Sequence, residues 1–302
     1  MENQDRIHLL AIKSLAIFII GLLIALLVLL TKQAWPAISE FGFEFITSDF
    51  WNPVEDQFGG LSFIAGTIIT SFIAIIIAAP ISIGVALLIT EVLPTAAGKA
   101  IGLFVEMIAA IPSIVFGLWG LFYLAPFVRE TLTPILKSTL GFIPFFTGPS
   151  FGIGVLTASL ILAIMIIPTI TSLCREVFKT IPTLQREAAL AIGSTRWEMI
   201  RLAVIKPSFS GIMGGVVLGL GRALGETMAV AMVIGNQPEI PKSIFSSAAT
   251  MASVIANEYA EADSDLHLSA LCLVGILLFG VTLIANSISR AIVWNYNRRM
   301  KG

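Results

Sequence analysis

Six long apolar runs constrain the fold of this chain more than any other feature of its sequence. They cover residues 12–30, 63–90, 101–125, 151–173, 211–235 and 268–293. A helix that crosses a membrane needs about 20 mostly apolar residues, and every run approaches or exceeds that length. Helices are expected rather than strands, because each helix satisfies its own backbone hydrogen bonds in lipid. The sequence therefore predicts an all-α integral membrane protein with six transmembrane helices.

Composition excludes a large soluble domain. Of the 302 residues, 57% are hydrophobic and 12% are charged, whereas a soluble domain has about 25% charged residues. The first run is longer than the core of a signal peptide and is not followed by a cleavage site of small residues, so we expect a retained anchor. We divide the chain into an anchor helix with an aromatic, acidic outer loop at 1–62, a core of five spans at 63–293 and a basic tail at 294–302.

The distribution of lysine and arginine predicts the orientation. Thirteen of them lie at the set of span ends that includes both termini and the 174–210 loop, and four lie at the opposite set. Positive residues stay preferentially on the cytoplasmic side, so both termini and this loop should be cytoplasmic. The opposite loops are acidic. They form either an ordinary solvated face or a docking rim for a soluble partner.

The 174–210 loop carries the signals of two short helices. Thr183, after a proline, can begin the first helix, and Gly193 suits the left-handed position just past a helix end. Thr195 and Glu198 have the spacing of a capping box that begins the second helix. Pro207 is expected to end the segment before the fifth span. The loop is either a docking surface for another protein or an amphipathic linker.

One motif of this loop resembles a known family. Glu187, Ala188, Ala189 and Gly193 form the pattern Glu-Ala-Ala-x-x-x-Gly, which is similar to the coupling loop of ABC importer permeases. The resemblance implies that these residues, together with Arg196, contact a cytoplasmic ATPase dimer. The chain departs from the pattern after the loop: the family usually has proline at the position of Lys206.

Further motifs resemble the phosphate-specific (Pst) importer permeases. They are Phe-Trp-Asn-Pro at 50–53, Phe-Gly-Gly-Leu at 58–61, Ile-Pro-Ser at 111–113 and Gly-Arg-Ala-Leu-Gly-Glu-Thr-Met-Ala at 221–229. The resemblance implies a type I ABC importer permease (MetI-like) fold in the inner (plasma) membrane of a bacterium or archaeon. It also implies three partners, besides membrane lipid: a second permease subunit (PstA-like), the ATPase dimer and an extracytoplasmic phosphate-binding protein. No nucleic acid is expected. ATP and Mg²⁺ would lie on the ATPase, so this chain would bind no cofactor.

Charged residues inside the apolar runs are the candidates for the substrate path. An ionisable group at the centre of a bilayer is costly, by about 2.5–3.5 kcal/mol on insertion scales, and it usually pairs or faces a polar cavity. Arg222 falls near the middle of the fifth run, and Glu226 follows one predicted helical turn later. The two form either a structural ion pair or an anion contact, because a guanidinium matches phosphate oxygens. With the neighbouring Thr227, and Ser113 of the third run, they make up the predicted path.

Other features of the runs allow both a structural and a functional reading. Glu106 and Pro112 are either a gate or structural. Prolines at 80, 112 and 168 should kink their helices. Glycines at 211, 215 and 219 favour close helix packing. The two cysteines, Cys174 and Cys272, should be small buried hydrophobes, because their spacing fits neither a metal site nor a disulfide framework.

The chain has no glycine-rich phosphate loop of the form Gly-x4-Gly-Lys-Ser/Thr. It is therefore expected to be a transport subunit rather than an enzyme. The sequence favours the channel subunit of an ATP-driven phosphate importer. The alternatives are a permease for another oxyanion, sulfate or molybdate, or an anion carrier or channel that needs no ATPase.

Overall fold

The computed structural model describes residues 2–301. Five helical stretches are long and apolar enough to cross a membrane: Ile12–Phe41, Leu61–Val92, Val155–Lys179, Arg196–Gly225 and Asp265–Asn295. A sixth span is obtained if two helices joined at a sharp bend, Thr95–Ala109 and Ser113–Leu140, are counted as one broken span. Over the described chain, the six apolar runs therefore correspond to these six stretches, although several bounds differ.

The α-helices are α1 (Glu2–Phe41), α2 (Glu44–Thr47), α3 (Leu61–Leu87), α4 (Thr95–Ala109), α5 (Ser113–Trp119), α6 (Ala125–Phe127), α7 (Thr133–Leu140), α8 (Val155–Lys179), α9 (Thr183–Ala191), α10 (Arg196–Met199), α11 (Lys206–Gly225), α12 (Met228–Ala231), α13 (Met251–Glu258) and α14 (Asp265–Lys301). Segments of π-helix, η1 (Leu88–Val92), η2 (Gly120–Leu124), η3 (Val128–Leu132) and η5 (Ile200–Ile205), continue some of them, and η4 (Pro144–Phe146) is a 3-10 turn. Strands β1 (Trp51–Asn52) and β2 (Gln57–Phe58) form an antiparallel hairpin.

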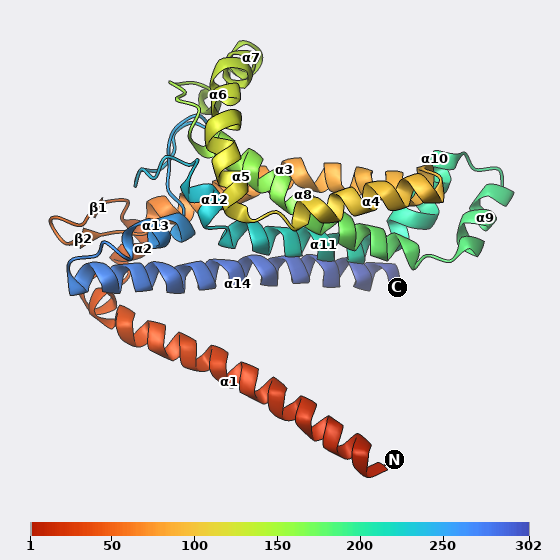
Figure 1. Ribbon diagram of the computed structural model, residues 1–302, viewed down its shortest axis with the longest axis horizontal. Coiled ribbons are helices and arrows are strands. Elements are labelled where there is room, and N and C mark those ends of the chain that lie inside the picture. Colours follow the sequence, from red (N-terminus) through yellow and green to blue (C-terminus); the bar gives the residue numbers. More distant parts are fainter. Residues whose placement is uncertain (1, 302) are drawn as a thin grey trace.

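The third predicted span, 101–125, is not one straight helix. Helix α4 ends at Ala109 and α5 begins at Ser113, and the helical stretch Ser113–Leu140 is bent by 89° relative to α4. Pro112 lies at the break, where its ring disfavours helical conformation in the residue before it. In Figure 1, α4 lies along the bundle whereas α5, α6 and α7 rise away from it. Of the three prolines expected to kink helices, Pro112 interrupts its span, while Pro80 and Pro168 lie inside α3 and α8.

The fifth predicted span, 211–235, has the wrong bounds at both ends. The helical stretch begins at Arg196 and ends at Gly225. Pro207 does not end the loop before the span, because a π turn precedes it: the Lys206 N–H donates to the Arg201 carbonyl, five residues back. The wider turn relieves the clash that a proline ring makes with the carbonyl four residues earlier in an α-helix. The backbone therefore passes Lys206 and Pro207 without a break.

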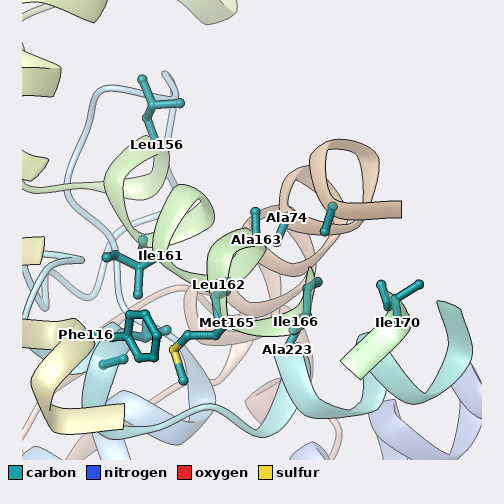
Figure 2. Packing of buried hydrophobic residues seen from close by; sticks show 14 of the residues in the cluster. Ala74, Phe116, Leu156, Ile161, Leu162, Ala163, Met165, Ile166, Ile170 and Ala223 are labelled. Atoms are coloured by element: carbon teal, nitrogen blue, oxygen red, sulfur yellow. The ribbon is translucent and has the colours of Figure 1, made fainter. Parts of the chain in front are cut away.

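Helix α8 forms the centre of the bundle. It packs against α3, α4 and α11, and its apolar residues fill the main core. Ile161, Leu162 and Ile166 of α8 are almost fully buried. Figure 2 shows them directed toward neighbouring elements that contribute Phe116 and Ala223. Burial on all sides explains why the sequence of α8 reads as a nearly continuous apolar run.

Glycines hold α11 close to α8. A side-chain carbon added at Gly211 would come within 2.6 Å of Val177, and one at Gly219 within 2.7 Å of Ile170. Gly215, between them, faces Leu173 at 3.5 Å. The four-residue spacing of these glycines therefore produces the close helix contact that the sequence predicts.

The first span lies at the edge of the bundle. In Figure 1, α1 meets α14 near its C-terminal end and diverges from it toward its N-terminus. None of the most apolar part of this span is buried. A second hydrophobic cluster fills the junction between the end of α1, the hairpin and α14, with Phe45, Trp51, Phe58 and Leu271 among its buried residues. Three aromatic residues of the first outer loop, Phe45, Trp51 and Phe58, are thus buried and contribute to packing.

Candidate coupling loop and anion groove

The 174–210 loop has the local structure that its sequence predicts. Helix α9 is followed by Gly193 with φ of +85°, the left-handed region that favours glycine. Thr195 and Glu198 form the capping box: the Glu198 N–H donates to Thr195 Oγ1, and the Thr195 N–H donates to Glu198. The second helix is not separate, however, because α10 continues through η5 into α11. The end of the loop and the fifth span therefore share one continuous helical stretch.

Apolar side chains are exposed on this loop. Leu184, Ile192 and Trp197 are 72%, 84% and 63% exposed. Glu187 and Ala188 are exposed as well, and Ala189 is half-buried. A side-chain carbon added at Gly193 would have no other atom within 4 Å. This grouping of exposed apolar residues makes the loop a candidate interaction site. The surface formed by these residues is called the coupling surface below.

Two arginines of the 174–210 loop, called the coupling loop below, form hydrogen bonds with the end of the second span. The guanidinium of Arg186 donates to both carboxylate oxygens of Glu91, at 2.7 and 3.0 Å, and also to the carbonyls of Phe178 and Ile181. Arg196 Nη2 donates to the Glu91 carbonyl at 2.8 Å. Arg196 is one of the predicted ATPase contacts, and the structure directs its guanidinium toward the chain's own backbone. Neither Arg186 nor Glu91 was predicted from the sequence, although a carboxylate near the end of an apolar run was a usable signal.

Glu106 pairs with a neighbouring helix. Its carboxylate accepts a hydrogen bond from Arg175 of α8. Gly102, one turn earlier on α4, leaves the space that the Arg175 guanidinium occupies. This pairing is the one that the structural reading of Glu106 expects. A role as a gate stays a prediction.

A groove lies between α8, α11 and α14, with a volume of about 1180 Å³. Its polar lining residues are Thr169, Ser210, Arg222, Asn286, Ser287 and Arg290. Arg222 is half-buried, and its Nη1 donates to Thr169 Oγ1 at 2.9 Å. This hydrogen bond fixes one side of the guanidinium against α8. We call this cavity the anion groove, after the role that is proposed for it below.

The predicted geometry of Arg222 and Glu226 is wrong. Helix α11 ends at Gly225, and Glu226 has extended backbone with ψ of 126°, so the two residues do not share a helix face. Over the described residues, no ion pair joins them. Neither Glu226 nor the adjacent Thr227 lines the anion groove. The end of the helix at a Gly-Glu step was not visible in the apolar pattern, which continues to residue 235.

Ser113 lies elsewhere, at the first position of α5. Helix α5 packs on α12, which begins directly after Thr227, and a side chain at Gly117 would collide with Met232 at 2.7 Å. Of the four residues of the predicted path, only Arg222 therefore lines the anion groove; Ser113 begins α5, and Glu226 and Thr227 lie just before α12. In the described part of the chain, no group of three or more metal-ligating side chains occurs.

Comparisons with known proteins agree with this architecture. The family profile described as "Binding-protein-dependent transport system inner membrane component" matches residues 79–301. A phosphate transport system permease protein PstC of Mesorhizobium japonicum is 47% identical over 291 residues, which are 95% of this chain and 89% of the relative. A PstC of Pasteurella multocida is 46% identical, with 94% and 90% covered.

Solved structures show the same fold at lower identity. A bacterial ABC transporter involved in the import of the acidic polysaccharide alginate matches 92% of this chain with a TM-score of 0.56 at 19% identity, and 95% of that chain is covered. The inward-facing MetNI methionine ABC transporter matches 75% of this chain and 93% of its own, with a TM-score of 0.52 at 18% identity. The predicted MetI-like permease fold is thereby confirmed. The chain belongs to the binding-protein-dependent transport system inner membrane components and, within that family, to the PstC permeases.

Proposed function

We propose that this chain is the transmembrane channel subunit of an ATP-driven importer of inorganic phosphate. The observation that carries this proposal is the 47% identity to a phosphate transport permease over 95% of the chain. The anion groove supports it independently, because an anion that crosses a low-dielectric barrier needs a positive partner along its path. The chain itself is not an enzyme. It binds no cofactor, and ATP with Mg²⁺ lies on a partner ATPase.

The coupling surface is the proposed contact with a cytoplasmic ATPase dimer. Its exposed apolar side chains support this role, and Glu187, Ala188, Ala189 and Gly193 match the coupling motif. This placement requires that the loop and both termini are cytoplasmic, as the distribution of positive residues predicts. A second permease subunit of PstA type completes the channel. An extracytoplasmic phosphate-binding protein docks on the acidic outer loops.

The mechanism follows from alternating access. Binding of ATP closes the ATPase dimer and displaces the coupling loop, and the continuous helix from Arg196 to Gly225 carries this displacement to Arg222. Phosphate delivered from outside first meets Glu226 and Thr227, where the Glu226 carboxylate accepts a hydrogen bond from the O–H of hydrogen phosphate. It then meets Arg222, whose guanidinium is oriented by Thr169 and binds phosphate oxygens with its remaining N–H groups. ATP and the loaded binding protein favour the same state.

The test is uptake of labelled phosphate into vesicles that contain the reconstituted complex of this chain, its partner permease, the ATPase and the binding protein. We expect ATP-dependent uptake that excess unlabelled phosphate suppresses and that sulfate and molybdate leave unchanged. Transport of sulfate in preference to phosphate would show that the chain serves another oxyanion. Uptake that persists without ATP or ATPase would show a carrier or channel.

A further inference from the structure

Helix α14 presents a polar face to the anion groove. Asn286 and Arg290 are four residues apart, hence on one side of the helix, and both line the groove. The Asn286 Oδ1 atom lies 4.0 Å from the position of a side-chain carbon at Gly221, so Asn286 sits beside the residue that precedes Arg222. The C-terminal span thus brings an amide next to the proposed phosphate contact.

Arg290 lies nearer to the coupling loop than Arg222 does. Helices α11 and α14 run in opposite directions, with the end of α14 and the start of α11 at the same end of the bundle as α9 and α10 (Figure 1). Arg290 is four residues beyond Asn286, which is about 6 Å along the axis at 1.5 Å per residue. An anion leaving Arg222 toward the coupling loop therefore passes Arg290.

The electrostatics of the groove favour an anion. Its lining contains two guanidinium groups and neither aspartate nor glutamate. Among the side chains that the structure describes, neither Arg222 nor Arg290 forms an ion pair, whereas Arg129, Arg175 and Arg186 each pair with a glutamate. Two unneutralised positive charges in one cavity of a membrane protein attract negative charge from outside the chain.

The groove also has room for a ligand. Gly214 and Gly221 both line it on α11. A side-chain carbon at Gly214 would have no other atom within 4 Å. The hydroxyls of Ser210 and Ser287 and the amide of Asn286 add hydrogen-bonding groups that suit a partly protonated oxyanion.

We propose that Arg290 and Asn286 form a second phosphate contact in the anion groove, which receives the anion after Arg222 on its way to the cytoplasm. This inference rests on the proposed function, because it takes phosphate as the cargo. Two adjacent contacts allow an anion to enter favourably and still leave, since neither has to bind it tightly. A phospholipid headgroup offers the same chemistry as free phosphate, so the experiment has to separate the two.

The test uses the complete reconstituted complex in lipid nanodiscs, with inorganic phosphate as the probe. Ser287→Cys places a thiol in the groove, and the native Cys174 and Cys272 are buried. Phosphate at ten times its half-protecting concentration should slow the reaction of this thiol with a maleimide about tenfold. Adding Arg290→Gln should raise the half-protecting concentration about tenfold. Adding Arg201→Gln should leave it unchanged, because Arg201 is exposed on the 174–210 loop and does not line the groove.

Two outcomes would overturn the inference. In the first, Arg290→Gln changes neither the half-protecting concentration of phosphate nor the KM for phosphate uptake. In the second, inorganic phosphate does not protect the thiol, but anionic lipid does. This outcome is detected by comparing nanodiscs of phosphatidylglycerol with nanodiscs of phosphatidylcholine. Uptake by Arg290→Gln is measured without the added cysteine as well, so the test does not depend on one variant. If wild-type uptake of phosphate is normal while these outcomes occur, the proposed function stands and the second contact fails.

Discussion

Arg186 of the coupling loop and Glu91 at the end of the second span form a bidentate ion pair, with nitrogen–oxygen distances of 2.7 and 3.0 Å. The Glu91 side chain is 5% exposed and that of Arg186 is 19% exposed. Because Arg186 also donates to the carbonyls of Phe178 in α8 and of Ile181 just after it, one guanidinium connects α9 with both the second and the fourth span. The loop is therefore bonded to more of the protein than the helix that directly follows it.

Replacement of Arg186 should uncouple the transporter. Arg186→Gln leaves Glu91 buried and unpaired, which costs about 3–5 kcal/mol for a buried pair, and α9 loses its connection to the spans. We expect phosphate uptake to fall by more than about tenfold while ATP hydrolysis by the assembled complex continues. Uptake and hydrolysis are measured on the same vesicles.

Arg201→Gln is the matched control for this substitution. Arg201 is an exposed arginine of the same loop with no ion pair in the described structure, so its replacement should change neither quantity. Equal losses of uptake in both variants would mean that charge on the loop matters and that the Arg186–Glu91 pair does not.

The backbone at Gly193 should decide whether the ATPase binds. Its φ of +85° is incompatible with proline, whose ring fixes φ near −65°, whereas asparagine visits the left-handed region at modest cost. We expect Gly193→Pro to lose retention of the ATPase in a pull-down and Gly193→Asn to keep it. Glu187→Lys, which reverses the charge of the coupling motif, should also lose it. Retention by all three variants would exclude the coupling surface as the docking site.

Close packing of α11 on α8 should be sensitive at Gly219. A larger side chain there collides with Ile170, whose atoms lie 2.7 Å from the position of an added carbon. Overpacking of this kind costs about 1–3 kcal/mol, so Gly219→Leu should lower the unfolding temperature of the purified subunit. Gly214→Ala is the control on the same helix, because it meets no atom within 4 Å. Equal shifts for the two variants would show that helix propensity and not packing controls stability there.

The outer hairpin should depend on Glu258. Trp51 Nε1 donates to Glu258 Oε2 at 2.9 Å, and His267 Nε2 lies 3.0 Å from the same oxygen. Hydrogen bonds to a charged group contribute about 1.5–3 kcal/mol, so Glu258→Ala should speed hydrogen exchange of residues 51–58. Glu261→Ala removes an exposed carboxylate nearby and should leave exchange unchanged. Unchanged exchange in Glu258→Ala would assign the stability of the hairpin to aromatic packing alone.

Local sequence signals predicted the coupling loop well. The capping box of Thr195 and Glu198 and the left-handed Gly193 each depend on residues within one or two turns. The packing role of Gly211, Gly215 and Gly219 in α11 was predictable for the same reason, because a four-residue spacing defines one helix face. The number of apolar runs likewise follows from the length that a membrane requires.

Features that depend on packing between distant segments were not predictable. Arg186 and Glu91 are 95 residues apart, and no local pattern states that they meet. The π turn before Pro207 and the bend at Pro112 both follow from a proline, but a proline fixes only that a helix is disturbed, not whether it widens or breaks. Glu226 was misplaced because the apolar composition continues beyond Gly225, where the helix ends.

The most direct test of the central claim is uptake of labelled phosphate by the reconstituted complex with Arg222→Gln in place of the wild-type chain. Because Arg222 is the half-buried cation that Thr169 orients in the anion groove, we predict that uptake falls to background while assembly and ATP binding persist. Arg201→Gln in the same complex should transport at the wild-type rate. Full phosphate uptake by the Arg222→Gln complex would contradict the account.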